Sequence, residues 1–468
     1  MAREQPPKPV QLCVFDTEHD YPEGEEAQRI LAYYPPDACS VDDQTSVIGL
    51  AQALLTFNAN FEGEATCDSM HAQRHVWAFH RPQTHIMMLA VIDQGWLPST
   101  TSDDGLRAVL RQAYAQFVLI HGPLHASLAT DGQTKASLQT ILTETAARLL
   151  RAKSADLLTL ASPLSMVGGV PWLPLDNHVF TAVHSLASQL TVTDMGGGQM
   201  VQGVMLLHGH HCLWSSQCQQ DTVSLYRLAA TALVPASQGP SIGKRLATAT
   251  SALRSQQAEP TYPVMSYKAW VRSPDNFLSM RPPAGSTETD QLLVPTLHLQ
   301  GDEEQLALLG YCQGNALLIL LLSQRGMVSS TTQHAVARLA HGPLRRISQA
   351  TAEQLTAHGH GHVPGFRYLF VDHMLTAVQA SPQSKVATLS PESLELMTSA
   401  QAELQSMGSS QGSNREVVVR GTHDCWVVAR HRNQRELYIV MEGKGEVGLA
   451  GAAELATDFA DKHFAALF

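Results

Sequence analysis

The stretch HVWAFHRPQTHIMMLAVI, residues 75–92, has the pattern of two β-strands joined by a short turn. β-Branched, aromatic and other apolar residues fill both halves, which is typical of strands packed in a sheet. Because proline marks turns, we expect Arg81-Pro82 to join the two strands. An amphipathic helix is predicted next, over roughly residues 103–120. Together these elements predict an antiparallel hairpin with a helix packed on it.

The same order of elements recurs twice further along the chain. Residues 203–216, GVMLLHGHHCLWSS, form a second predicted hairpin, followed by a helix over about 220–234. Residues 425–442, CWVVARHRNQRELYIVME, form a third, followed by a helix over about 452–467. We therefore predict the α+β class, with three units that each place helices on a mostly antiparallel sheet. Stretches rich in proline, glycine, serine or histidine are predicted loops: 162–174, 235–295 and 357–365.

A helix with two apolar sides is predicted over residues 43–61, DQTSVIGLAQALLTFNANF. Asp43 and Ser46 are the expected caps at its start. One side carries Leu50, Leu54, Phe57 and Phe61 at intervals of three and four residues, and the other carries Ile48, Ala51 and Leu55. Such a helix must bury both sides. Either it lies inside one large domain, or it packs on its own sheet and on a second protein.

Composition and charge exclude several classes of function. The formal net charge is −11, and no basic face for binding phosphates is evident, so we expect no nucleic-acid partner. The longest apolar run, residues 316–322, is too short for a membrane helix, and no signal peptide is predicted. The seven scattered cysteines indicate reduced thiols of a cytoplasmic protein rather than a disulfide framework.

A cluster of histidines and cysteines raises the question of a metal site. His208, His210, His211, Cys212 and Cys218 are residue types that bind zinc. A structural zinc site needs four ligands, usually as two separated pairs, and the other histidine cluster is HGHGH at 358–362, in a glycine-rich break. A polar turn accounts for the first cluster better. We expect neither a metal nor a cofactor.

The segment GYCQGN, residues 310–315, has the form of a nucleophile elbow with Cys312 in place of serine. That motif needs a strand before it and a helix after it. The following residues 316–323, ALLILLLS, are apolar on every side and favour a buried strand, so the glycines suit a hairpin turn better. An α/β-hydrolase with Cys312 as nucleophile remains a minor alternative. Residues 238–245 do not match a phosphate-binding loop, because the glycine spacing is wrong.

Several segments, in this order, resemble the CCZ family, the calcium–caffeine–zinc sensitivity proteins of vacuolar fusion. The resemblance covers roughly residues 10–445, and the ordered set is more specific than any single piece. The segments are EGEEAQRILAYYPPD (23–37), VIGLAQALLTFNANF (47–61), VLRQAYAQFVLIHG (109–122), LPLDNHVF (173–180), LLHGHHCLWSS (206–216), FRYLFVDHMLTAVQAS (366–381) and DCWVVARHRNQRELYIVME (424–442).

The resemblance implies three tandem longin domains. We expect them at residues 8–158, at 172–345 with an insertion near 235–295, and at 363–468. It also implies a heterodimer with a monensin-sensitivity (MON) family protein. Such a pair acts as a guanine nucleotide exchange factor for a late-endosomal or vacuolar Rab GTPase of the Rab-seven type. The protein would then be cytoplasmic and recruited peripherally, through the complex, to the late-endosomal or vacuolar membrane.

Within that family the two first longin domains lie side by side and form the Rab-binding surface. The 43–61 helix would then face the partner or the Rab, and we expect Ile48, Ala51, Leu54 and Leu55 to contribute to this surface. Exchange needs no bond-making chemistry, so no catalytic residue is expected. Alternatives are a longin-domain adaptor, and an exchange-factor subunit of the Hermansky–Pudlak type that acts on another Rab.

Overall fold

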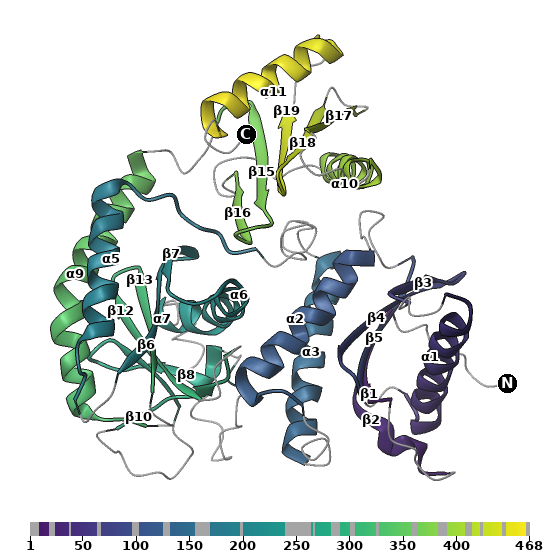
Figure 1. The fold of residues 1–468 in the computed structure, drawn as a ribbon, viewed down its shortest axis with the longest axis horizontal. Coiled ribbons are helices and arrows are strands. Elements are labelled where there is room, and N and C mark those ends of the chain that lie inside the picture. The colour runs from purple at the N-terminus through teal and green to yellow at the C-terminus, as the bar shows by residue number, and fades with distance from the viewer. Residues whose placement is uncertain are drawn as a thin grey trace, which may run out of the picture.

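The computed structural model contains three α+β units in chain order (Figure 1), which confirms the predicted class. It describes all residues except 1–8, 18–23, 37–38, 63–66, 96–102, 125–131, 155–168, 197–199, 239–263, 265–266, 282–290, 300–304, 324–326, 358–362, 382–390, 408–413, 422–424, 442–445 and 465–468.

The first unit is an antiparallel sheet in the order β2-β1-β5-β4-β3, with helices on both faces. Helix α1 covers one face, while α2 and α3 cover the other (Figure 1). Because both faces are covered, strands β1 and β5 are apolar along nearly their whole length. The elements are β1 (Val10–Asp16), η1 (Glu26–Arg29), β2 (Ile30–Tyr34), α1 (Val41–Glu62), β3 (Ser69–His71), β4 (His75–Gln83), β5 (Ile86–Asp93), α2 (Asp103–His121) and α3 (Gly132–Ser154).

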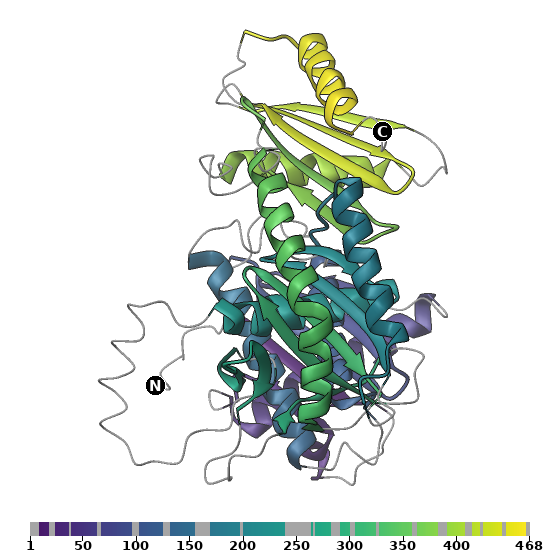
Figure 2. The same ribbon diagram turned by 90° about the vertical axis from the view of Figure 1, so that its left-hand side faces the viewer.

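The second unit has the larger sheet, in the order β7-β6-β13-β12-β9-β8, with β11 beside β12. Helices α5 and α9 lie side by side on one face (Figure 2), and α6, η2 and α7 pack on the other. The elements are α5 (Asn177–Val192), β6 (Val201–His208), β7 (His211–Ser215), α6 (Gln219–Leu228), η2 (Ala229–Leu233), α7 (Val234–Gln238), η3 (Tyr267–Ala269), β8 (Trp270–Arg272), β9 (Phe277–Met280), β10 (Leu292–Leu293), β11 (Thr296–Leu297), β12 (Leu306–Gln313), β13 (Ala316–Leu322), β14 (Met327–Val328) and α9 (Ser330–Ala357).

The third unit is a sheet in the order β16-β15-β19-β18-β17, between α10 on one face and α11 on the other. The aromatic residues of α11 pack on those of β15; for example, the ring centroids of Phe366 and Phe459 are 5.0 Å apart. The elements are β15 (Phe366–Asp372), β16 (Ala377–Ala380), α10 (Pro391–Ser406), β17 (Arg415–Arg420), β18 (Trp426–Arg432), β19 (Arg435–Met441) and α11 (Leu449–Phe464).

The five-strand order of the first and third sheets recurs in β7-β6-β13-β12-β9 of the second sheet, which adds β8 and β11, and this order shows how the predicted hairpins correspond. The hairpin β6–β7 occupies the place of β1–β2 and β15–β16, whereas β4–β5 and β18–β19 correspond to β12–β13. The predicted pattern of a hairpin followed by a helix is present three times, but the hairpin in 203–216 is not the structural equivalent of the one in 75–92. The turn in 75–92 also lies at Thr84-His85 instead of Arg81-Pro82, because β4 continues through an irregularity between His80 and Gln83.

The second unit has two features that the sequence did not indicate. The expected insertion near 235–295 contributes strands β8 and β9 to the sheet, because Trp270, Phe277 and Leu278 are almost completely buried. The short apolar segments of this region lie between stretches rich in proline and serine, so the sequence did not indicate strands there. Helix α9 runs to Ala357, beyond the boundary expected at 345, although it contains Pro343.

Helix α2 joins the first two units, because it belongs to both cores. Residues such as Leu110 and Phe117 pack in the first core, while Leu119 is buried among apolar residues of the second unit. The Nε2 atom of Gln116 donates a hydrogen bond of 3.1 Å to the carbonyl of Ser224 in α6. The backbone N–H of His298 donates one of 2.8 Å to the carbonyl of Leu119.

Candidate interaction surface

A reciprocal hydrogen-bond pair fixes the start of α1. The N–H of Asp43 donates to the Oγ of Ser40 at 3.1 Å, and the N–H of Ser40 donates to Oδ2 of Asp43 at 3.3 Å. This is a capping box, with Asp43 in the returning position rather than as the first cap. Ser46, the other expected cap, instead donates to the carbonyl of Asp42 within the helix.

The side of α1 that carries Ile48 and Ala51 faces its own sheet. These two residues are 3% and 0% exposed, and they pack in one cluster with Trp77, Leu89 and other residues of the sheet. Leu55 is half-buried against the same cluster, and Leu54 is half-buried. Two of the four residues expected to face a partner, Ile48 and Ala51, are thus core residues in this fold. Whether Leu54 and Leu55 contact a partner stays a prediction.

The opposite side of α1 is apolar and faces solvent. Leu50 is 50% exposed and Phe57 is 63% exposed. Two small exposed residues, Gly49 and Ala53, lie beside them, and a Cβ added at Gly49 would meet no atom within 4 Å. We call Gly49, Leu50, Ala53 and Phe57 the outer strip. The sequence therefore predicted two apolar sides correctly but exchanged their destinations. The side chain of Phe61 is not among those described.

A polar residue precedes each side of α1, so the sequence at the start of the helix does not identify the outward side. Ser46 lies one turn before Leu50 and is exposed, and residues four apart share a side of a helix. The sequence 46, 50, 53, 57 is therefore one continuous side that begins polar and continues apolar. Gln44 precedes the other side, which carries Ile48, Ala51 and Leu55. The side chain of Gln44 is buried and donates to the carbonyl of Cys39.

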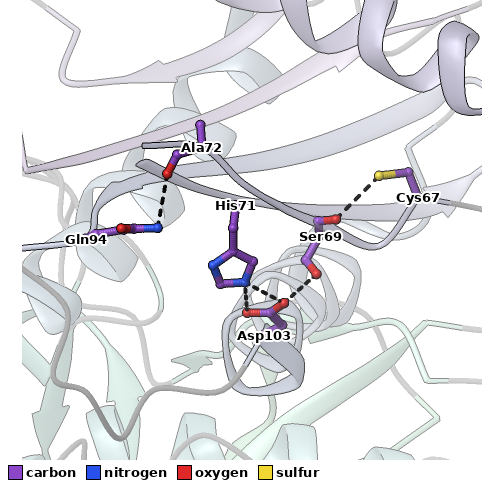
Figure 3. A network of polar contacts seen from close by, with 6 residues as sticks. All are labelled: Cys67, Ser69, His71, Ala72, Gln94 and Asp103. Carbon is purple, nitrogen blue, oxygen red and sulfur yellow. Dashed lines mark hydrogen bonds and ion pairs between the residues drawn. The ribbon is translucent and has the colours of Figure 1, made fainter. Parts of the chain in front are cut away.

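A polar network ties the edge strand β3 to the start of α2 (Figure 3). The Oγ of Ser69 donates to Oδ2 of Asp103 at 2.5 Å, and Nε2 of His71 lies 2.9 Å from both carboxylate oxygens. Arg107 pairs with Asp68 at 2.9 Å, one residue before the strand. Met70, between the two anchored residues, packs in the same cluster as Ile48. The network therefore holds the edge of the sheet on which α1 rests.

This network is structural in character. Burial acts to raise the pKa of Asp103, but the hydrogen bonds from Ser69 and His71 outweigh it and hold that pKa below its usual value. The serine contacts the carboxylate and not the imidazole (Figure 3), so no base is placed to activate its hydroxyl. The residues form a brace and lack the geometry of a Ser-His-Asp site.

The histidine-rich turn lies where it was expected, between β6 and β7, with Gly209 at φ +58° in the turn. His208 and His211 are paired across the hairpin, and burial lowers the pKa of His208, which favours its neutral form. Cys212 is buried, and burial raises its pKa to about 12. Within the described part of the chain, no three His, Cys, Asp or Glu side chains are grouped to hold a metal ion. His358, His360 and His362 lie outside the described residues.

The structure contradicts a hydrolase site at Cys312. The residue lies in β12, and Gly314-Asn315 is the turn into β13, so no helix follows the motif. Cys312 is 1% exposed, and burial raises its pKa to about 12. A thiol in that state is neither ionised near neutral pH nor accessible to a substrate.

Two family models match the chain at its ends. The model described as the first longin domain of INTU, CCZ1 and HPS4 matches residues 11–122, and the one described as Intu longin-like domain 3 matches residues 364–457. These ranges lie within the first and third units of the structure and leave out α3 and the end of α11. The two matches therefore define a longin-domain protein, as the sequence predicted.

Comparison with curated proteins extends the likeness to nearly the whole chain. Vacuolar fusion protein CCZ1 homolog B of Arabidopsis thaliana is 28% identical over 98% of this chain and 97% of its own length. The CCZ1 homolog of Oryza sativa subsp. japonica is 29% identical over 93% of each chain, and that of Nematostella vectensis is 25% identical over 95% and 94%. The chain is thus similar over nearly its whole length to curated CCZ1 homologues, and longin-domain models match it at both ends. Among its described residues, no helix is both long and apolar enough to cross a bilayer.

Proposed function

We propose that this chain is one subunit of a heterodimeric guanine nucleotide exchange factor that acts in vacuolar fusion. Its partner would be a MON-family longin protein, and its target a late-endosomal or vacuolar Rab GTPase. The proposal draws on the family, whose curated members are named vacuolar fusion proteins. The complex would act on the membrane surface, to which it is recruited peripherally.

The outer strip of α1 is the observation that carries this proposal. Large apolar side chains on the outside of a helix mark an interaction site when they are contiguous. The second unit offers an internal comparison, because α6 follows β6–β7 as α1 follows β1–β2. Helix α2 of the first unit packs against α6: Gln116 donates to the carbonyl of Ser224, and Leu119 lies in the same apolar cluster as Leu225. In α1 the side away from its sheet carries Leu50, half of whose surface reaches solvent.

Nucleotide exchange suits a surface of this kind. A Rab holds its nucleotide through a phosphate loop, Mg²⁺ and ordered switch segments. An exchange factor binds a switch arrangement of the Rab that is incompatible with Mg²⁺ and therefore lowers the affinity of the Rab for nucleotide. Bound nucleotide lowers the affinity of the Rab for the exchange factor by the same factor. The exchange factor therefore needs an extended contact surface and no nucleophile, in keeping with the buried state of Cys312.

The test is release of a fluorescent nucleotide from a panel of Rabs, with and without the co-expressed MON-family partner. We expect the complex to accelerate release from a vacuolar Rab and this chain alone to leave it unchanged. Leu50→Asp should weaken binding of the partner or the Rab by about 30-fold or more, because it places a charge at the centre of an apolar contact. Val192→Asp is the matched control, since Val192 is 81% exposed at the end of α5 in the second unit.

Each other outcome contradicts a specific part of the proposal. A complex that binds the Rab without changing release would be an adaptor. Release from a different Rab alone would favour the Hermansky–Pudlak type of exchange factor. If Leu50→Asp left both assembly and release intact while the chain stayed folded, the outer strip would not be the contact surface.

A further inference from the structure

The second and third units turn equivalent sheet edges toward each other. Strand β7 is the edge of the second sheet, and β16 holds the same position in the third. An open edge presents unpaired N–H and C=O groups, so folded proteins cover it. In the first unit, the side chain of Gln139 from α3 does so: it accepts from the N–H of Tyr33 in β2 at 3.1 Å and donates to its carbonyl at 2.8 Å.

Residues 169–173, which we call the strap, lie between β7 and β16. On one side Val170 pairs in parallel with Ala377 of β16. The N–H of Val170 donates to the carbonyl of Thr376 at 2.7 Å, and the N–H of Val378 donates to the carbonyl of Val170 at 3.0 Å. The edge of the third sheet is thus extended by a segment that precedes the second unit in the sequence.

On its other side the strap pairs with β7. Trp172 forms a parallel bridge with Cys212. The N–H of Cys212 donates to the carbonyl of Pro171 at 2.9 Å, and the N–H of Leu173 donates to the carbonyl of Cys212 at 3.0 Å. The pairing changes sides between Val170 and Pro171, so consecutive residues serve the two sheets.

Side chains secure the strap in both units. Val170 is completely buried in the core cluster of the second unit that contains Cys212 and Leu233. Gly169 lies against Val378 of β16: a Cβ at Gly169 would be 1.8 Å from Cγ2 of Val378 and 2.9 Å from its Cβ. Because valine is branched at Cβ, it cannot easily rotate out of the way. The close approach at this position requires glycine.

We propose that the strap fixes the third unit on the second, so that the two sheets move as one body, and that Gly169 makes this contact possible. The Nε2 of Gln219 in α6, which donates to the carbonyl of His373 at 3.4 Å, is a weaker link between the same two units. The strap also belongs to the segment of chain that connects the first unit to the second. Its release would free the third unit to move independently.

A cleavable version of the full chain tests this directly. A protease site placed between Ala357 and Val363 lets the third unit be cut from the rest after folding. We expect the two fragments of the otherwise unchanged chain to co-elute in size-exclusion chromatography. Gly169→Ala should separate them, because the added Cβ overlaps Val378. Separation of the unchanged fragments, or co-elution of those carrying Gly169→Ala, would overturn the proposal.

A compensating change distinguishes the strap from general loss of stability. Val378→Ala removes Cγ2, the atom that a Cβ at Gly169 would approach to 1.8 Å, and leaves only the contact of 2.9 Å with the Cβ of residue 378, which a small shift relieves. The double variant Gly169→Ala with Val378→Ala should therefore co-elute again. Gly342→Ala is the matched control, because a Cβ there meets nothing within 4 Å, and it should leave co-elution unchanged. Failure of the rescue, or separation of the control, would each refute the role of the contact between Gly169 and Val378.

Discussion

At the scale of single residues, an ion pair in the third unit makes stability depend on pH. Nε2 of His373 lies 3.1 Å from Oε1 of Glu436, which is almost completely buried and also accepts from the Oη of Tyr438. The hydrogen bond to Glu436 raises the pKa of His373. Burial acts to raise the pKa of Glu436, but the bonds from His373 and Tyr438 outweigh it and lower that pKa. Glu436 is therefore charged throughout the range in which His373 titrates.

His373→Asn should destabilise the chain most at mildly acidic pH. A group with a raised pKa contributes its full stability below its unfolded pKa, about 6.5, and loses it as pH rises through the folded pKa. We expect the variant to lose about 1 kcal/mol of unfolding free energy near pH 6, since the pair is partly solvated, and less at higher pH. Urea unfolding of both chains across this range measures the difference.

Glu436→Gln provides the control for this titration, because it keeps the shape of the side chain and removes the charge. In that background burial still lowers the pKa of His373, so the destabilisation by His373→Asn should no longer increase toward acidic pH. A difference between wild type and His373→Asn that stayed constant from pH 6 to pH 9 would contradict the assigned role of the pair.

The sequence shows residues that are able to form such pairs, but it does not show which of them pair with each other. His373 stands in a segment that resembles the family, yet Glu436 lies in another hairpin and meets it only through the pairing of β15 with β19. Ser69 and Asp103 are likewise brought together by the fold (Figure 3). Periodicity describes one element at a time, so contacts between distant elements are outside its reach.

At the scale of elements, α1 shows what periodicity can and cannot decide. Two apolar sides were predicted correctly from the spacing, and the structure has both. The assignment of Ile48 and Ala51 to the outward side failed, because leucine, isoleucine and alanine are equally compatible with a core and a contact surface. A polar residue precedes each side, Ser46 before Leu50 and Gln44 before Ile48, so the start of the helix does not distinguish them either.

Alanine substitutions on the two sides of α1 should have different effects on the isolated chain. Ile48→Ala should lower the free energy of unfolding by about 2–4 kcal/mol, because it leaves a cavity against the sheet. Leu50→Ala should change it by less than about 0.5 kcal/mol, because Leu50 is half exposed. Chemical denaturation of the purified chain measures both. Equal losses for the two variants would show that the assignment of the sides is wrong.

The three hairpins show a second limit at this scale. Their existence could be read from alternating apolar residues and turn residues, and all three are present. Their equivalence could not, since it depends on which strands are neighbours in each sheet. Strand order placed β6–β7 with β1–β2, and strands β8 and β9 emerged from a region predicted to be an insertion.

At the scale of the whole molecule, α2 links the stability of the first two units. Leu119 is 2% exposed and packs in the core of the second unit, although its helix belongs to the first. Leu119→Ala should therefore reduce protection from hydrogen exchange in both sheets, by an amount equivalent to about 2–5 kcal/mol. Exchange mass spectrometry on peptides from β5 and β13 measures the two effects separately.

Leu186→Ala is the matched control for that experiment. Leu186 of α5 is also 2% exposed, but it packs only in the cluster between the second sheet and its outer helices. We expect it to lower protection in β13 and to leave β5 nearly unchanged. If Leu119→Ala behaved in the same way, the two cores would not be coupled through α2.

The sequence predicted three units but not how they join. Each junction depends on a few residues whose role is visible only in three dimensions: Leu119, at the end of a helix, and Gly169, in a stretch predicted to be a loop. Neither residue type carries a signal for a contact between domains.

The strap also has a consequence for how the chain is made on the ribosome. Val170 emerges about 200 residues before Ala377, so at 5–20 residues per second its partner strand arrives roughly 10–40 seconds later. During that interval β7 can already hold Pro171 and Leu173, while the amide of Val170 still awaits an acceptor. A nascent chain therefore passes through a stage in which the strap is paired with β7 but not yet with β16. During this stage chaperones have time to act before the third sheet is translated.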